Sequence, residues 1–182
     1  MLKVTIPETE LFDNRTSEFI VVKSQTLTLE HSLVSISKWE SKWHVPFIGD
    51  KKKTSAQSLD YVRCMTLTQN VDPLVYRVIP NSIMQQIRDY IDNPMTATWF
   101  SEEQERRFRS KFEVVTSEII YYWMIASGVP FECQKWHFNR LLTLLKVCGE
   151  KNKPQKKMSQ RAILERNARL NAQRRAAMKS KG

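Results

Sequence analysis

The feature that most constrains this fold is an apolar stretch over residues 112–149 that is interrupted once. Its first part reads EVVTSEIIYYWMIASGVP, and the apolar residues there are nearly contiguous. A helix of that kind is expected to be buried on most of its circumference. Gly128 and Pro130 then predict the end of one helix and the start of the next, because glycine accepts a positive φ angle and proline suits a first helical turn.

The second part of the stretch, FECQKWHFNRLLTLLKVCG, has apolar residues at mostly three- and four-residue steps and predicts a second helix that ends at Gly149. Two helices joined by so short a link pack as a helical hairpin. We expect this hairpin to be the core of the fold. The residues predicted to be buried are Leu59, Val62, Ile87, Ile119, Tyr122, Trp123, Trp136, Leu141 and Leu145.

The N-terminal part of the chain predicts β structure. Residues 2–6 alternate between apolar and polar and predict a short strand, whereas residues 8–16 are polar and predict a loop. Residues 17–31 are rich in β-branched residues and predict a hairpin that turns at residues 23–25. A small β-hairpin is therefore expected to precede the helices.

Helix-capping patterns follow the predicted hairpin. Ser32 is expected to cap a helix over residues 33–43, because a serine oxygen accepts a hydrogen bond from the free amides of a first turn. The spacing Thr54-x-x-Gln57 is a capping box and predicts a helix over residues 54–68.

A second capping box, Ser82-x-x-Gln85, predicts a helix over residues 82–92. Residues 95–100 predict a short strand, and the charged segment that opens at Ser101 predicts a further helix or a loop. Together these elements predict an α+β fold that is mainly α-helical. It would have a short N-terminal β-hairpin, a helical core with a central αα-hairpin, and a basic C-terminal helix.

The excess positive charge of the chain is confined to its C-terminal part. The net charge is +10, from 29 Lys and Arg against 19 Asp and Glu. Residues 151–182 hold 11 of the basic residues and one acid, which gives +10, so residues 1–150 hold 18 of each and are neutral. A basic tail on a neutral body attracts polyanions through the tail alone. We therefore predict a globular domain over 1–149 and a basic linker with a helical tail over 150–182.

The tail is the candidate binding element. Residues 158–178 favour a helix, but their apolar stripe is thin. Such a helix is marginal alone in water, so it is expected either to be ordered by a partner or to lack a fixed structure. Its charges could bind nucleic acid, dock on an acidic partner or only solubilise the chain. The candidate partner-binding residues are Arg161, Ile163, Arg166, Arg169, Leu170, Arg174 and Arg175.

The chain shows no pattern typical of a catalytic or metal centre. Cys133 and His137 lie four residues apart, but neither CxxC nor HxxxH spacing is present, so core packing explains them better than zinc does. Phosphate-loop, nucleotide-binding and catalytic-triad motifs are also missing. We expect a protein that is not an enzyme and that uses no cofactor.

Three cysteines in apolar contexts, Cys64, Cys133 and Cys148, predict reduced thiols and therefore a cytoplasmic protein. The N-terminal residues lack the apolar region of a signal peptide. No apolar run approaches the length of about 18 residues that spans a bilayer. Neither export nor contact with a membrane is expected.

Four segments of the chain carry a resemblance to a known family. They are EIIYYWMIASGVPFECQKWHFNRLLTLLKVC, KKMSQRAILERNARLNAQRR, SLVSISKWESKW and LDYVRCMTLTQNVDP. In these segments, and over about residues 25–175, the chain resembles the tail assembly chaperones of tailed bacteriophages. The resemblance implies a non-enzymatic factor of the host cytoplasm that coats the long tape-measure protein, keeps it soluble and helps to recruit tail-tube subunits.

The partners that the resemblance implies are the tape-measure and tail-tube proteins. A tape measure is helical with an apolar stripe, so binding it requires a helix-in-groove surface, which the helices predicted over 54–68 and 82–92 could offer. We also expect a homo-oligomer, because a neutral body lets copies approach. Two alternatives stay open: a structural or connector subunit of the virion (tail, neck or baseplate), and a small protein that binds nucleic acid through its basic tail.

Overall fold

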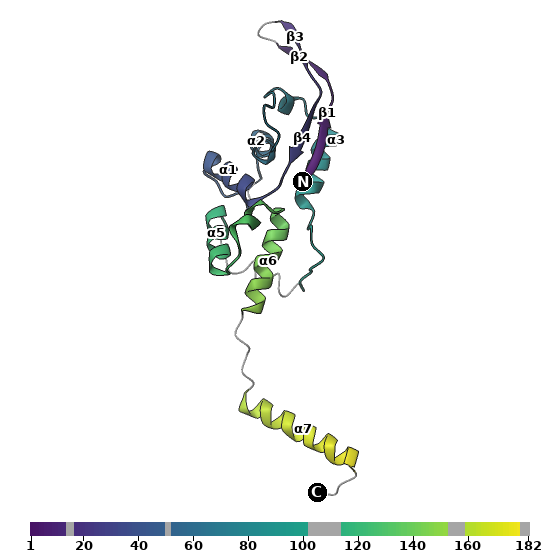
Figure 1. Cartoon of the computed structure of the whole chain (residues 1–182), viewed down its shortest axis with the longest axis vertical. Coiled ribbons are helices and arrows are strands. Elements are labelled where there is room, and N and C mark those ends of the chain that lie inside the picture. The colour runs from purple at the N-terminus through teal and green to yellow at the C-terminus, as the bar shows by residue number, and fades with distance from the viewer. Residues whose placement is uncertain (14–16, 50–51, 102–113, 153–158, 179–182) are drawn as a thin grey trace. The chain divides into compact units, whose positions relative to one another are not determined.

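The computed structural model describes residues 1–13, 17–49, 52–101, 114–152 and 159–178, and it is mainly α-helical with antiparallel β structure (Figure 1). It divides into two units, residues 1–150 and residues 151–182, which are treated separately below. The strands are β1 (Leu2–Ile6), β2 (Thr9–Asp13), β3 (Glu18–Val22) and β4 (Gln25–Leu29). The helices are α1 (Leu33–Trp43), α2 (Ser55–Met65), α3 (Asn81–Asp92), α5 (Ser117–Ala126), α6 (Phe138–Lys151) and α7 (Gln160–Met178), with short 3-10 segments η1 (Val75–Arg77) and η2 (Phe131–Lys135).

The strands form two antiparallel pairs, and one pair lies in the sequence between the two strands of the other. β1 pairs with β4, and β2 pairs with β3. The predicted strand over 2–6 is confirmed. The loop predicted over 8–16 is wrong over Thr9–Asp13, which forms β2, and its residues 14–16 lie outside the described residues; the hairpin turn predicted at 23–25 is wrong, because β3 and β4 do not pair with each other. Ser24 instead donates a hydrogen bond from Oγ to the carbonyl of Ile6 at 3.0 Å. This bond joins the two backbone segments where one strand pair ends and the other begins.

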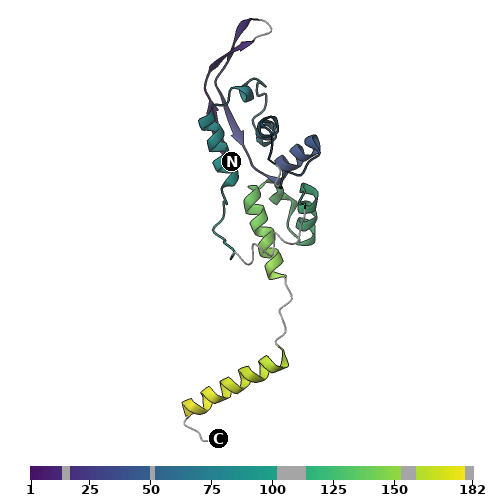
Figure 2. The ribbon, with the colours of Figure 1, turned by 180° about the vertical axis from the view of Figure 1, so that it is seen from behind.

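The two strand pairs differ in what surrounds them. Val4, Ile6, Leu27 and Leu29 are buried in the β1–β4 pair, which lies between α3 and α2 in both views of the ribbon (Figures 1 and 2). The β2–β3 pair projects beyond the helices, and we call it the arm (residues 9–13 and 18–22). One face of the β1–β4 pair is therefore part of the core, whereas the arm is largely exposed.

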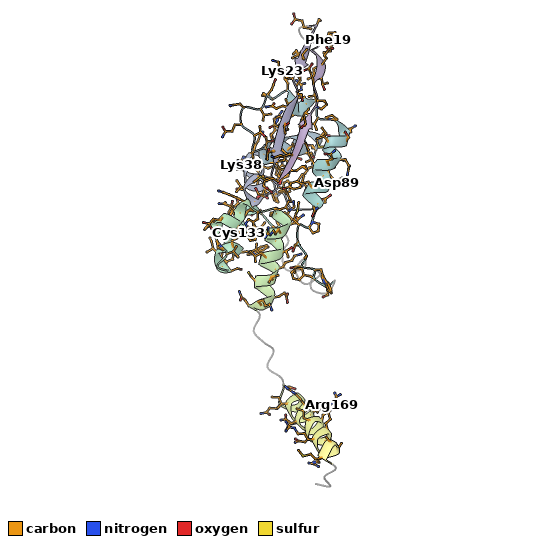
Figure 3. All side chains as sticks on the ribbon, turned by 45° about the vertical axis from the view of Figure 1, so that its right-hand side comes forward. Phe19, Lys23, Lys38, Asp89, Cys133 and Arg169 are labelled. Carbon is orange, nitrogen blue, oxygen red and sulfur yellow. The ribbon has the colours of Figure 1, made fainter. Side chains whose placement is uncertain are left out.

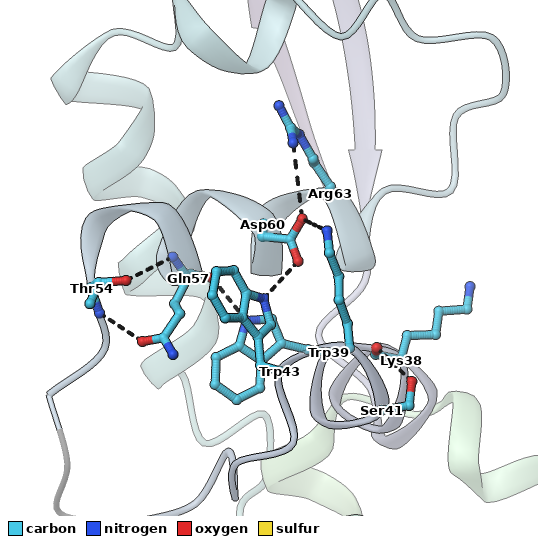
Figure 4. A network of polar contacts seen from close by, with 9 residues as sticks. Lys38, Trp39, Ser41, Trp43, Thr54, Gln57, Asp60 and Arg63 are labelled. Carbon is cyan, nitrogen blue, oxygen red and sulfur yellow. Dashed lines mark hydrogen bonds and ion pairs between the residues drawn. The ribbon is translucent and has the colours of Figure 1, made fainter.

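The capping predictions for α1 and α2 are confirmed. Ser32 caps α1 by accepting a hydrogen bond from the amide of Ser35. Thr54 and Gln57 form the reciprocal capping box of α2 (Figure 4). The prediction for α3 is wrong in its cap, since Asn81 starts the helix directly after Pro80 and no side chain caps it. Residues 95–100 contain no strand, and the segment after Ser101 lies outside the described residues.

Polar contacts from buried aromatic residues fasten α1 to α2. Trp39 donates from Nε1 to the carbonyl of Gln57 at 2.9 Å, and Trp43 donates from Nε1 to a carboxylate oxygen of Asp60 at 2.9 Å (Figure 4). Lys42 binds the other oxygen of the same carboxylate. These contacts satisfy the polar atoms of a tryptophan-rich interface that buries Trp39 almost completely.

The central stretch differs from its prediction. Gly128 has the expected positive φ of 66°, but α5 buries only Ser117, Ile120 and Met124. Tyr122 is 66% exposed and Ile125 is 63% exposed, so the prediction of a helix buried on most of its circumference is wrong. The main packing partner of α5 among the other elements is α1, and its opposite side therefore faces away from the core.

The second helix of the stretch also starts later than predicted. A 3-10 segment occupies residues 131–135, α6 begins at Phe138, and it continues past Gly149 to Lys151. Trp136, which was predicted to be buried, is 36% exposed, and the guanidinium of Arg140 lies 4.4 Å from its ring centre. This cation–π contact stabilises the partly exposed indole ring of Trp136 at the surface.

The core lies around β1, β4 and α1 more than in the central hairpin. Of the residues predicted to be buried, Val62, Ile87, Leu141 and Leu145 are buried, whereas Leu59, Ile119 and Trp123 are only half-buried. The prediction omitted the largest fully buried side chains, which come mostly from the strands and the first helices: Trp39, Ile6, Leu27, Leu29, Leu33, Ile36 and Met65.

Glu40 holds α5 to the rest of the body. Its carboxylate is 7% exposed and accepts hydrogen bonds from two backbone amides, those of Phe47 and Ser117, at 2.7 Å each. Ser117 is the first residue of α5, so Glu40 satisfies a free amide of that helix and lies at the positive end of its dipole. A side chain of α1 thus takes the place of a local N-cap, which the residue before α5, Thr116, does not supply.

We expect Glu40→Ala to lower the free energy of unfolding by about 2–4 kcal/mol, because it leaves two amides in the interior without acceptors. The measurement is urea denaturation followed by circular dichroism. Glu132→Ala removes an exposed acid from η2 and is the matched control, with an expected change within about 0.5 kcal/mol. Equal effects of the two substitutions would contradict this role of Glu40.

Candidate protein-interaction surfaces

Five titratable side chains form a buried polar network where β4 leads into α1: Glu30, His31, Tyr61, Tyr90 and His137. His31 Nδ1 is hydrogen-bonded to the hydroxyl of Tyr61. Tyr90 donates its hydroxyl to Glu30 at 2.7 Å, and His137 donates from Nε2 to the backbone carbonyl of Tyr90 at 2.9 Å. The rings of His31 and His137 meet edge to face, with centroids 5.1 Å apart.

Burial favours the uncharged form of three members of this network, His31, His137 and Tyr61. Burial, and then the charge of His137, lower the pKa of His31 from 6.5 to about 3. Burial likewise lowers the pKa of His137, and it raises the pKa of Tyr61. Every member is at most 8% exposed, so these groups bind one another and the backbone and are not presented to solvent. The network therefore connects elements of the fold.

The residues weighed as metal ligands do not gather into a site. Cys133 is buried on η2 and Cys148 is half-buried near the end of α6. Within the described ranges, no group of three or more His, Cys, Asp or Glu side chains is placed to hold a metal ion. His137 donates a hydrogen bond from Nε2 to the carbonyl of Tyr90, so that nitrogen is not available as a metal ligand.

One exposed apolar area lies on α5 and η2, and we call it the α5 surface (Tyr121, Tyr122, Ile125 and Phe131). Tyr121 and Ile125 are four residues apart and therefore lie on the same side of the helix. The ring of Phe131 stacks on that of Tyr121, with ring centroids 6.3 Å apart, and the hydroxyl of Tyr121 donates a hydrogen bond to Oε1 of Gln134. Tyr122, Ile125 and Phe131 are each more than half exposed, so the surface is largely uncovered.

The helices that were predicted to form a client groove are less suitable. The fully exposed residues of α2 are Ser55, Ala56, Ser58 and Arg63. Those of α3 are Asn81, Ser82, Gln85, Gln86, Arg88, Asp89 and Asp92. Both helices turn their apolar residues toward the body, as amphipathic surface helices do, so neither presents an apolar stripe to a partner.

A second exposed apolar area lies on the arm. Phe12 and Phe19 are directly opposite each other, with ring centroids 5.1 Å apart, and they are 50% and 69% exposed. Val21 lies two residues from Phe19, hence on the same face, and it is also more than half exposed. Figure 3 shows Phe19 near the outer end of the arm and Lys23 nearer to the body.

All the predicted partner-binding residues lie on one element, α7. The helix predicted over 158–178 is observed over Gln160–Met178. Ile163 and Leu170 are seven residues apart, which places them on one side of the helix two turns from each other. Arg161 is hydrogen-bonded to Glu165 at 3.2 Å in an exposed i,i+4 pair. The exposed predicted residues are Arg161, Ile163, Arg166, Arg169, Leu170, Arg174 and Arg175.

The charge of α7 surrounds the helix and does not form a single basic face. Residues 160–178 contain five arginines and one glutamate, which gives +4. Arg166 and Arg174 lie within about 60° of the Ile163–Leu170 side around the helix axis, whereas Arg169 and Arg175 lie more than about 90° from it. A helix of this kind suits a flexible or extended polyanion, or an acidic protein surface, better than a bilayer.

The comparisons leave the function to physical argument. No family model, no curated protein and no solved structure matches this chain. Among the described residues, none of the helices combines the length and the hydropathy that crossing a bilayer requires.

Sequence reasoning missed both exposed apolar surfaces of the body. It assigned Tyr122 to the core because apolar residues run on without a break around it, and it made no assignment of Ile125 to a surface. It placed Phe12 in a loop, because Thr9–Asp13 reads TELFD and shows no alternation; the only signal was the β-branched run of Glu18–Val22, with which it pairs.

We expect the free energy of unfolding to fall as the pH decreases below about 6.5, because His31 stays neutral in the folded protein but gains a proton in the unfolded chain. His31→Gln should remove about 1 kcal/mol of the difference in stability between pH 7 and pH 5.5. Urea denaturation at the two pH values is the measurement.

The chain offers a matched control, because its third histidine, His44, is exposed at the end of α1. His44 has a φ of 51°, so His44→Asn is the substitution that best keeps its left-handed backbone. A pH dependence that is the same in His31→Gln and in the wild-type chain would contradict the role assigned to the buried histidine.

Proposed function

We propose that this chain is a tail assembly chaperone that acts in the host cytoplasm, binds the tape-measure protein of a tailed bacteriophage and promotes assembly of the tail tube. The proposal rests on the resemblance of four segments to that family. The observation that supports it most directly is the uncovered α5 surface. A folded body that leaves tyrosine, isoleucine and phenylalanine side chains in water is suited to bind an apolar partner.

The α5 surface suits a helical client with an apolar stripe. Tyr121 and Ile125 form a ridge along α5, and Phe131 extends it toward η2 through its stack on Tyr121. Fully burying a side chain of this size stabilises by about 1.5–3 kcal/mol. A contact of three or four such residues is strong enough to cover a client segment and weak enough to be released when tail-tube subunits replace the chaperone.

The tail would add a second kind of contact. Its arginines attract an acidic stretch of the tape measure or of a tail-tube subunit, and attraction between exposed charges weakens as salt is added. The apolar contact on α5 does not weaken in this way. The two contacts therefore differ in their dependence on salt, which allows them to be measured separately.

The same tail supports a second candidate function, binding to nucleic acid. The specific observation is the +10 charge of residues 151–182, which is of the size that neutralises several phosphates. This candidate predicts that nucleic acid is retained by the chain at low salt and released at high salt. It makes no use of the α5 surface.

We expect the double variant Tyr122→Ser/Ile125→Ser to capture at least about 10-fold less tape-measure protein than the wild-type chain, because it removes the two most exposed apolar residues of α5. The measurement is a pull-down of the tagged full-length chain co-expressed with the tape-measure protein. Leu67→Ser is the matched control, since it removes an apolar residue that is 50% exposed away from α5. No capture by the wild-type chain would refute the proposal.

Replacing Arg166, Arg169, Arg174 and Arg175 by Gln is expected to reduce capture at about 0.05 M salt and to have little effect at about 0.5 M salt, where exposed charges are screened. Arg161 is left in place because it already pairs with Glu165. If the wild-type chain retains nucleic acid and no tail protein, and this variant retains neither, the nucleic-acid candidate replaces the chaperone.

A further inference from the structure

The arm has unused pairing capacity along both of its edges. Within the described residues, β2 and β3 pair only with each other, so the outer edge of each strand has backbone groups free to pair. A two-stranded ribbon is marginal in water by itself.

The two edges differ in charge, and only one of them suits pairing with its own copy. In β2, Glu10 and Asp13 flank Leu11 and Phe12, so two β2 strands side by side would bring four acids close together. In β3, Phe19, Ile20 and Val21 are consecutive and uncharged. All three are strong strand formers, and all three are exposed.

We propose that a second copy of this chain pairs with the free edge of β3, in an antiparallel arrangement whose two-fold axis passes beside Ile20. Each Phe19 is then opposite Val21 of the second copy, on one face of a four-stranded sheet, and the two Ile20 residues face each other. A two-fold contact of this kind is self-complementary, because each copy supplies the same edge. It also covers the exposed strand edge, which soluble proteins avoid leaving open.

Charge favours this register. The two Glu18 side chains lie at opposite ends of the paired segment, about four residues or 13 Å apart along the strands, which exceeds the screening length of about 8 Å at physiological salt. Like charges are therefore separated along the paired strands.

Other occupants fit the arm less well. Residues 8–22 contain four acids and one base, so nucleic acid and anionic surfaces are repelled. A helical client satisfies its own backbone groups and cannot pair with the free edge of β3. The proposal goes beyond the chaperone function, because it concerns contact between copies and is tested without any client.

The test uses charge at the two-fold axis. Ile20→Glu and Ile20→Lys each place two like charges opposite each other, whereas an equimolar mixture of the two variants places opposite charges there. By sedimentation velocity at about 0.1 mM, the wild-type chain should show a species of twice the 21.5 kDa chain mass. Each variant alone should dissociate at least about 10-fold more readily, and the mixture should recover the dimer.

Leu67→Glu and Leu67→Lys are the matched controls, because they make the same changes at an apolar residue that is 50% exposed outside both the arm and the α5 surface, and they should leave the dimer unchanged. A monomeric wild-type chain, a dimer of undiminished stability in Ile20→Glu, or a mixture that stays monomeric would each overturn the proposal. Hydrogen exchange needs no variant: the amides of β3 should exchange more slowly as wild-type concentration rises. Exchange independent of concentration would overturn the proposal as well.

Discussion

The body depends on one buried segment of backbone, from Leu27 to Leu33, which runs from β4 into α1. The amide of Glu30 donates to the carbonyl of Met65 at 2.9 Å, and the carbonyl of His31 accepts from the amide of Phe138 at 2.8 Å. The carboxylate of Glu30 accepts the hydroxyl of Tyr90, and Ser32 caps α1. One segment thereby joins α2, α6, α3 and α1, so the positions of four helices follow from the course of a single strand.

This arrangement separates the polar chemistry of the body from its apolar contacts. The buried side chains of His31, Tyr61, Tyr90 and His137, residue types that are frequent in catalytic sites, are bound to one another, to Glu30 or to the backbone inside the fold. Large apolar side chains remain exposed on α5, on η2 and on the arm, and single ones are exposed elsewhere, among them Leu67 and Trp99. A buried polar network fixes the geometry of a fold when its members have partners, and exposed apolar residues on a fixed geometry form defined contact surfaces. Both features favour a protein that acts through binding.

The sequence predicted local features well and three-dimensional surroundings poorly. Capping boxes depend on residues three apart, so the starts of α1 and α2 could be placed to within a residue. The arm could not, because its two strands are separated in the sequence and only cross-strand neighbours define their pairing. For α5, the run of apolar residues gave its helical state but not its burial. That depends on how much of the helix other elements cover, and among the described residues α1 is its main packing partner.

Salt distinguishes the contacts that this chain can make. Strand pairing depends on backbone hydrogen bonds, and the α5 surface depends on apolar burial, so both should persist when ionic strength rises. The contacts of α7 depend on exposed arginines and should not persist. The excess charge of the chain lies entirely in residues 151–182, and the remainder is neutral. Association between bodies is therefore not opposed by net charge, whereas attraction to a distant polyanion can come only from the tail. A chain divided in this way can find an acidic partner through its tail and hold an apolar one through its body.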